Sequence, residues 1–299
     1  MQLILGTAQF GLDYGISNQT GRVSPGEVTN ILAEASRLDI RLLDTAPAYG
    51  PSEEVVGALS AREGDFQIVG KTLAITDEKI GPQQLDDFRE ALDQTMAHFG
   101  GGPLYGILIH HGMDALKKGG GALLEILADY RRGGHVQRIG ISVDRVEELD
   151  DLLGHIDFEI VQVPLNILNQ KLITGGYVSR LEARNVEIHA RSLFLQGLVF
   201  LKPEQLPDSL SEAAGPLERI QSMSRETGLD ICTLAIGYVE RQPGIDYGVV
   251  GVTTTVELID IHRAWRQYQD DPAMSGLDFS SLAISDPVVT TPSLWAGRS

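Results

Sequence analysis

Short apolar runs alternate along the chain with longer segments of helical periodicity. The apolar runs are nearly continuous, whereas a strand with one face in water alternates apolar and polar positions. Continuous runs are typical of parallel strands that are covered on both faces. We therefore expect eight buried strands, at residues 3–6, 41–44, 66–71, 105–110, 136–142, 158–163, 186–192 and 247–252.

The segments between these runs carry the pattern of amphipathic helices. Ser24 precedes Pro25, the order preferred at a helix start, and Gly133 and Gly228 stand where helix ends are expected. Pro51 opens a further helical segment, and another follows the last strand. The remaining helices are expected at residues 24–38, 83–100, 122–134, 145–156, 217–228 and 231–242.

Eight strand–helix units in about 270 residues predict an α/β fold, a (β/α)8 TIM barrel, as a single domain over residues 1–299. An open doubly wound sheet is the alternative, but no Gly-x-Gly-x-x-Gly follows the first strand. The irregular stretch 195–215 is expected to cover the top of the barrel. The tail from about residue 270 has no strong periodicity and is expected to wrap over the barrel or to be partly mobile.

Composition and charge narrow the class of protein. A hydrophobic share of 42% favours a large core over disorder. The net charge of −17 disfavours nucleic acid and anionic membranes as partners, although a local cation could still bind an anionic substrate. Cys232 is the single cysteine, so no disulfide can form within the chain, which fits a reducing compartment. Cys232 is expected to be a core residue. With no signal peptide and no apolar run near the ~20 residues of a membrane span, we expect a soluble, cytoplasmic protein.

Polar residues stand at the ends of the expected strands. In a barrel, the carboxyl ends of the strands meet at one mouth, where active sites form. Each such residue has a structural explanation when it is taken alone, such as capping, contact with water or a buried histidine. Their occurrence on consecutive strands favours a functional site. In chain order they are Asp44 with Tyr49 close behind, Lys71, His110 with His111, Ser142, Gln162 with Asn166, and Arg191 with Ser192.

Four of these residue types together support the reduction of a carbonyl group. A tyrosine can donate a proton to the carbonyl oxygen, but its ordinary pKa near 10 calls for help from a nearby ammonium. A carboxylate keeps that ammonium charged, and a neutral imidazole can orient the substrate oxygen. No side chain supplies hydride, so a nicotinamide cofactor is implied. We therefore predict Asp44, Tyr49, Lys71 and His110 as the catalytic residues.

The sequence resembles the aldo-keto reductase superfamily over roughly residues 3–265. The resemblance is carried by "LGTAQFG", "LLDTAPAYGPSEEVVGAL", "GISV" and "VQVPLNIL", and "RSLFLQGL" is similar to a run in a short bacterial-type subgroup. It implies that Tyr49 is the proton donor, that Asp44 and Lys71 tune it, and that His110 rather than His111 orients the carbonyl. The cofactor-binding residues that it implies are Gly6, Thr7, Asp44, Ser142, Gln162, Arg191, Ser192, Leu193, Gln196, Gly197, Gly251, Thr253, Thr254, Thr255 and Glu257.

Several positions depart from the family pattern. Val143 stands where an asparagine would hold the nicotinamide carboxamide, and Arg191 stands where many members have an aromatic ring, so its guanidinium plane could stack there instead. Thr253 and Thr254 replace the cation that grips the 2′-phosphate of NADPH, and Glu257 adds a carboxylate nearby. NAD(P)H is thus the expected cofactor, with NADH tolerated or preferred. The backbone amides of Thr253 to Thr255 could still bind some phosphate.

Two other functions remain open from the sequence. The chain could be a regulatory protein that binds a nicotinamide cofactor with little turnover, or a lyase or aldolase that uses Lys71 as a Schiff base. The substrate is expected to be a small carbonyl compound, with sugars among the candidates. Candidate pocket residues are Phe10, Tyr14, Phe194 and Trp295. Candidates for contact with an anionic group are Arg191, Arg184 and Lys202.

Overall fold

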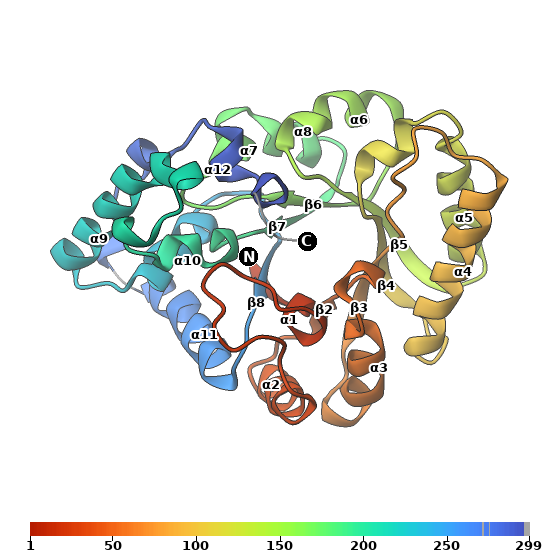
Figure 1. Cartoon of the computed structure of the whole chain (residues 1–299), viewed down its shortest axis with the longest axis horizontal. Helices are drawn as coiled ribbons and strands as arrows, with labels where there is room; N and C mark the ends of the chain where they lie inside the picture. Colours follow the sequence, from red (N-terminus) through yellow and green to blue (C-terminus); the bar gives the residue numbers. More distant parts are fainter. Residues whose placement is uncertain (271, 275, 296–299) are drawn as a thin grey trace.

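Eight parallel strands close into a barrel in which each strand pairs with its sequence neighbours and β8 pairs with β1 (Figure 1). This computed structural model describes residues 1–270, 272–274 and 276–295. The (β/α)8 TIM barrel expected from the sequence is confirmed. The strands are β1 Gln2–Gly6, β2 Leu42–Asp44, β3 Gln67–Lys71, β4 Leu104–Ile109, β5 Val136–Ser142, β6 Ile160–Pro164, β7 Glu187–Arg191 and β8 Tyr247–Gly251.

Helices surround the barrel on all sides (Figure 1). Ser24 caps the first long helix by accepting a hydrogen bond from the amide of Glu27, and Gly228 ends α9 with a φ of 76°, as expected from the sequence. The helices are α1 Ala8–Gly11, α2 Pro25–Arg37, α3 Ser52–Glu63, α4 Pro82–His98, α5 Gly121–Arg132, α6 Leu149–His155, α7 Lys171–Thr174, α8 Tyr177–Glu182, α9 Ala214–Thr227, α10 Ile231–Glu240, α11 Thr255–Asp270 and α12 Pro287–Thr290.

The sequence pattern missed some elements and displaced others. The short helices α7 and α8 were not expected, because Gly175 and Gly176 interrupt the periodicity between them. The helix expected at 145–156 begins instead with the 3-10 turn η3 Val146–Glu148, before α6. The stretch 195–215 is mostly 3-10 helix rather than irregular. Its segments are η4 Leu195–Phe200, η5 Pro203–Gln205 and η6 Asp208–Ala213.

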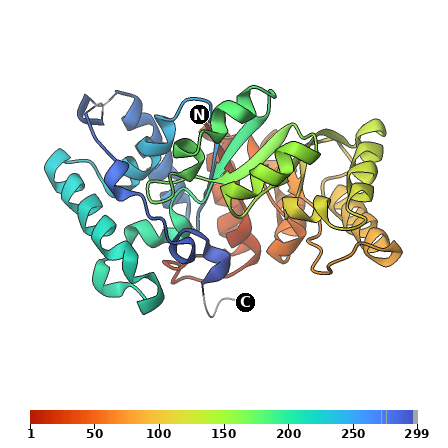
Figure 2. The ribbon, with the colours of Figure 1, turned by 90° about the horizontal axis from the view of Figure 1, so that it is seen from above.

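The described part of the tail wraps against the barrel. The amide of Ile284 donates to the carbonyl of Leu168, and Gln170 Nε2 donates to the carbonyl of Phe279, so the tail is fastened to the segment after β6. Figure 2 shows the N-terminus, which leads directly into β1, on one side of the barrel and the dark-blue C-terminal segment on the other. The last described part of the tail, which contains α12, therefore lies on the side where the strands end. Positions 271, 275 and 296–299 of the expected tail lie outside the described residues.

The interior of the barrel is filled in layers. A separate apolar cluster takes one residue from each of five strands, Ile4, Leu42, Val69, Leu108 and Ile160. Alternate residues of the strands point outward into the larger core shared with the helices. At the amino ends of the strands, Glu187 joins Tyr105 and Arg138 in a polar network. The interior is thus closed below, and the residues at the carboxyl ends of the strands face an open mouth.

None of the helices in the described part of the chain is both long and apolar enough to cross a membrane.

Candidate active site

Asp44 and Lys71 form a buried ion pair at the ends of β2 and β3. Lys71 Nζ lies 2.6 Å from each carboxylate oxygen of Asp44. The side chain of Lys71 is 1% exposed and that of Asp44 is 3% exposed. Burial lowers the pKa of Lys71, but the charge and hydrogen-bond effects of Asp44 and, next to it, Tyr49 together raise it by more, so that the pKa lies above its ordinary value. Gln162 Nε2 donates to Asp44 Oδ2 at 2.7 Å. The ammonium is therefore held charged and fixed.

Tyr49 ends the 3-10 turn η1 Pro47–Tyr49, one loop after Asp44. Its ring centroid lies 5.1 Å from Lys71 Nζ. The turn packs closely against α1 at Gly11. Only glycine fits there, because a Cβ would lie 1.7 Å from the carbonyl oxygen of Tyr49. Ser52 adds a hydrogen bond of 2.8 Å to the carbonyl of Thr7. The short loop thus fixes the phenol beside the ammonium.

The net shift in the pKa of Tyr49 differs from the sequence expectation. Burial raises this pKa, and the nearby Lys71 lowers it by less, so the pKa lies above its ordinary value. The expectation of a net lowered pKa was wrong, because it counted the ammonium and not the loss of water around the phenol. Tyr49 is consequently a neutral phenol, which is the form that can donate a proton.

His110 presents a neutral imidazole beside Tyr49. Burial, with smaller effects from Lys71 and His111, lowers the pKa of His110 to about 3. Its ring meets that of Tyr49 edge-on, with centroids 6.2 Å apart and planes at 88°. His111 stacks on the outer face of His110 at 5.1 Å and is half exposed. The geometry agrees with the expectation that His110 is the inner histidine and His111 lines the mouth.

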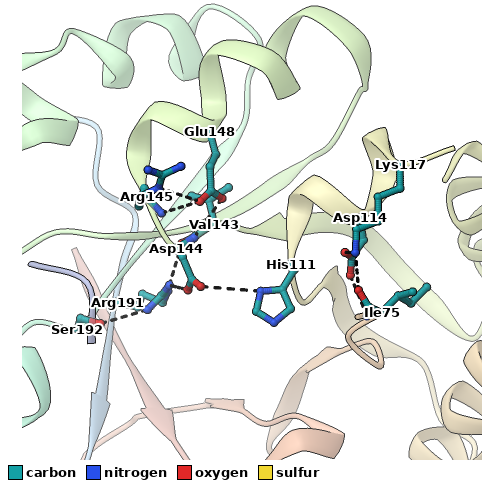
Figure 3. Close-up of polar contacts among 10 residues, drawn as sticks. All are labelled: Ile75, His111, Asp114, Lys117, Val143, Asp144, Arg145, Glu148, Arg191 and Ser192. Carbon is teal, nitrogen blue, oxygen red and sulfur yellow. Dashed lines mark hydrogen bonds and ion pairs between the residues drawn. The ribbon is translucent and has the colours of Figure 1, made fainter. Parts of the chain in front are cut away.

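Arg191 is held in place by one backbone oxygen and one side-chain oxygen from the two residues that follow β5. Arg191 Nη2 donates to the carbonyl of Val143 at 2.8 Å and to Asp144 Oδ1 at 2.7 Å (Figure 3). The other carboxylate oxygen of Asp144 lies 3.9 Å from His111 Nδ1, so these residues form a chain across the mouth. Val143, which replaces the expected asparagine, contributes only its backbone carbonyl. Stacking of Arg191 on a nicotinamide stays a prediction.

A cavity of about 540 Å³ opens beside Tyr49 and runs to the start of α11. This volume lies within the range of small-molecule and cofactor sites. Most of the predicted site residues line it, namely Gly6, Thr7, Asp44, Tyr49, Gln162, Arg191, Ser192, Leu193, Gln196, Gly197, Gly251, Thr253 and Glu257. The five that do not are Lys71, His110, Ser142, Thr254 and Thr255. Of these, Lys71 contacts Asp44 and lies near the Tyr49 ring, and His110 meets the Tyr49 ring edge-on.

Some backbone amides that were expected to bind the cofactor already have partners in the chain. The amide of Thr7 donates to the carbonyl of Asp44, and that of Gly197 donates to the carbonyl of Phe194. The amide of Thr253 donates to Glu257 Oε2 at 2.6 Å, and that of Thr255 donates to Glu27 Oε1 at 2.7 Å. In this structure a nearer acceptor takes each of these amides, and the binding of phosphate by the amides of Thr253 to Thr255 stays a prediction.

The sequence missed the polar loop that covers the cavity. The loop is fastened to η4, since the amide of Ile16 donates to the carbonyl of Gln196 and Gln196 Nε2 donates to the hydroxyl of Tyr14. Its Gly, Ser and Asn residues signalled a turn, but nothing local placed it over the barrel. The lining residues of this loop are Tyr14, Gly15, Ser17, Asn18, Gln19 and Thr20.

The remaining pocket candidates divide between the cavity and the core. Tyr14 and Phe194 line the cavity, whereas Phe10 and Trp295 are buried in the core. Neither Arg184 nor Lys202 is among the cavity residues, and Arg184 lies 3.9 Å from Asp157. Cys232 does line the cavity. Burial raises the pKa of its thiol to about 12, so the thiol is not reactive at neutral pH.

A closed (β/α)8 barrel with a Tyr, Lys, Asp and His cluster at its mouth defines a class of oxidoreductase barrels. The model of the aldo/keto reductase family matches residues 2–277, and the chain belongs to this family. Membership implies the use of a nicotinamide cofactor and the reduction of carbonyl compounds. No curated protein matches the chain in a sequence search.

Solved structures with the same fold are aldo-keto reductases at low sequence identity. AKR11C1 from Bacillus halodurans, in its holo form, aligns with a TM-score of 0.70 and 18% identity over 95% of this chain and 93% of that one. PA4992 from Pseudomonas aeruginosa, described as an aldo-keto reductase, aligns with a TM-score of 0.65 and 22% identity over 90% of each chain. At these identities the likeness concerns the fold.

Proposed function

We propose that the protein is an NAD(P)H-dependent oxidoreductase that reduces the carbonyl of an aldehyde, ketone or sugar, with Tyr49 as the proton donor. The observation that carries this proposal is the buried Asp44–Lys71 pair, whose ammonium lies 5.1 Å from the ring centroid of Tyr49. Tyr49 lines the cavity, so a substrate can reach it.

The residues of the cavity fit a nicotinamide dinucleotide. The cavity is lined from Asp44 and Tyr49 at the strand ends to Thr253 and Glu257 at the start of α11, and its volume of about 540 Å³ lies within the range of cofactor sites. When bound, the dinucleotide supplies the hydride that no side chain can supply. Because the hydride would have to reach a carbonyl beside Tyr49, the nicotinamide half would be held by the residues at this end, and the adenosine half by those at the start of α11.

Each residue of the cluster then has a distinct task. Tyr49 gives its proton to the substrate oxygen as negative charge develops there. Lys71 stabilises the phenolate that remains, and Asp44 keeps Lys71 charged inside the protein. His110, which is neutral because its pKa is about 3, can donate a hydrogen bond that orients the substrate oxygen but has no extra proton to give.

The same geometry disfavours a Schiff base on Lys71. A Schiff-base lysine reacts as the neutral amine, which a lowered pKa would favour. Lys71 is instead paired with both oxygens of Asp44, is 1% exposed and has a raised pKa. Its role as a fixed charge fits reduction better than lyase or aldolase chemistry.

We infer that NADH is tolerated, or preferred over NADPH. Glu257 lines the adenosine end of the cavity, and one of its oxygens accepts hydrogen bonds from the amide and hydroxyl of Thr253. A carboxylate accepts a ribose diol well and repels a 2′-phosphate. Arg191, the lysine or arginine among the lining residues, is paired with Asp144 at 2.7 Å and not with a residue at the start of α11.

A panel assay with wild type and Tyr49→Phe tests the proposed function. We expect oxidation of NADH or NADPH with some aldehydes, ketones or aldoses, and a loss of about 10² to 10⁴ in kcat/KM in the variant. Tyr130→Phe is the control, since Tyr130 lies on α5 outside the cavity and its hydroxyl donates to Asp93. Tight cofactor binding without turnover on any carbonyl would favour the regulatory function instead. A cytoplasmic location stays a prediction that cell fractionation tests.

A further inference from the structure

The start of α11 has the form of a phosphate site, but its donors are already used. The amides and dipole at the N-terminus of a long helix attract anions. Here the amide of Thr253 is taken by Glu257, that of Thr255 by Glu27, and that of Glu257 by the hydroxyl of Thr254. The positive end of this helix is therefore neutralised by carboxylates of the chain itself.

Glu27 comes from a different helix and is firmly placed. It lies in the first turn of α2, which runs beside α11 (Figure 1). Its Oε1 accepts from the amide of Thr255 at 2.7 Å and from the Thr255 hydroxyl at 2.9 Å, while Asn30 donates to its Oε2 at 3.0 Å. The hydrogen bond from the Thr255 amide lowers the pKa of Glu27, so the carboxylate stays charged at neutral pH.

Within the described residues, neither Glu27 nor Glu257 forms an ion pair with a lysine, arginine or histidine; the hydrogen bonds of Glu27 come from Thr255 and Asn30. Glu257 and Asp260 line this end of the cavity, and the nearest cation on α11, Arg263, is already 2.8 Å from Asp260. A 2′-phosphate that approached the start of α11 would meet at least two negative charges and few free amides. A ribose diol would meet an acceptor instead.

We propose that Glu27 is a cofactor-selecting residue: it does not itself line the cavity, but it takes the Thr255 amide and adds a negative charge at the start of α11, which disfavours the 2′-phosphate of NADPH and so favours NADH. This inference rests on the proposed function, because it assumes that a nicotinamide dinucleotide occupies the cavity. It extends that function by assigning selection to a residue outside the β8–α11 segment.

Binding titrations test the assignment without any turnover. Dissociation constants for NADH and NADPH are measured by fluorescence for wild type, Glu27→Gln and the control Glu54→Gln, which removes an exposed carboxylate of α3. Glutamine keeps an acceptor for Thr255 and removes the charge; its new amide nitrogen replaces the oxygen that accepts from Asn30, whose side-chain amide can turn its own oxygen toward it. We expect Glu27→Gln to tighten NADPH about five- to tenfold with less than about a twofold change for NADH. The control should change neither.

Salt dependence gives an independent check on wild type, for the case that Glu27→Gln fails to fold. If the 2′-phosphate is repelled, raising the salt concentration should improve NADPH binding relative to NADH; if it is gripped by cations, the ratio should move the other way. The latter result, or an unchanged NADPH to NADH ratio in Glu27→Gln, would overturn the inference. Failure of wild type to bind either dinucleotide would instead refute the proposed function.

Discussion

The Asp44–Lys71 pair allows stability and catalysis to be separated by mutation. In Asp44→Asn, Lys71 keeps its burial but loses the carboxylate 2.6 Å away. An ion left unpaired in the interior destabilises a protein by about 3–5 kcal/mol, which is a large part of a typical folding free energy of about 5–15 kcal/mol. The pKa of Lys71 should fall, because burial then acts without the opposing attraction.

The double variant Asp44→Asn/Lys71→Met should reverse the loss of stability but not the loss of activity. Replacing a buried pair by groups without charge is often neutral for stability. However, Tyr49 would still lack the ammonium that stabilises its phenolate. Urea denaturation and the rate of carbonyl reduction, measured on the same samples, follow the two effects separately.

An exposed ion pair provides the control for this series. Arg89 and Asp86 lie 3.5 Å apart on α4 with side chains 51% and 73% exposed, and Asp86→Asn should change stability by less than about 1 kcal/mol. The reasoning would be refuted if Asp44→Asn were as stable as the control variant. It would also be refuted if the double variant regained stability and full activity together.

Two further predictions concern pH. Burial raises the pKa of Glu53 to about 7, so between about pH 4.5 and 7 the folded protein holds a proton that the unfolded chain has lost. The free energy of unfolding should therefore fall by up to about 3 kcal/mol as the pH rises through this window. Urea denaturation at several pH values should show that Glu53→Gln removes this decline, and an unchanged pH dependence would contradict the assignment. Because the pKa of His110 is about 3, kcat/KM should show no acidic limb near pH 6.5; a limb there that disappears in His110→Gln would show that the imidazole titrates in the working range.

Much of the site was predictable because its signals are local to the strand ends. In a barrel, the residue that ends each strand faces the same mouth, so the sequence alone groups Asp44, Lys71 and His110. The short loop from Asp44 to Tyr49 likewise fixed the place of the phenol. These inferences needed only the strand assignments and the parallel topology.

Other features depend on contacts between distant segments or on burial. Glu27 meets Thr255 across 228 residues of sequence, and neither residue carries a pattern that points to the other. The loop over the cavity is held by Gln196, which lies 182 residues after Tyr14 in the sequence. The pKa of Tyr49 depends on a balance between burial and the charge of Lys71, which residue types alone do not give.

The most direct test of the central claim is to follow the hydride itself. Wild type is incubated with NADH deuterated at both C4 positions and a carbonyl compound that it reduces, and the alcohol is examined by mass spectrometry. If Tyr49 is the proton donor of a reductase, the alcohol carries one deuterium on its carbinol carbon, and Tyr49→Phe forms almost none of it while still binding NADH. Undiminished formation of labelled alcohol by Tyr49→Phe, or unlabelled alcohol from wild type, would contradict the account.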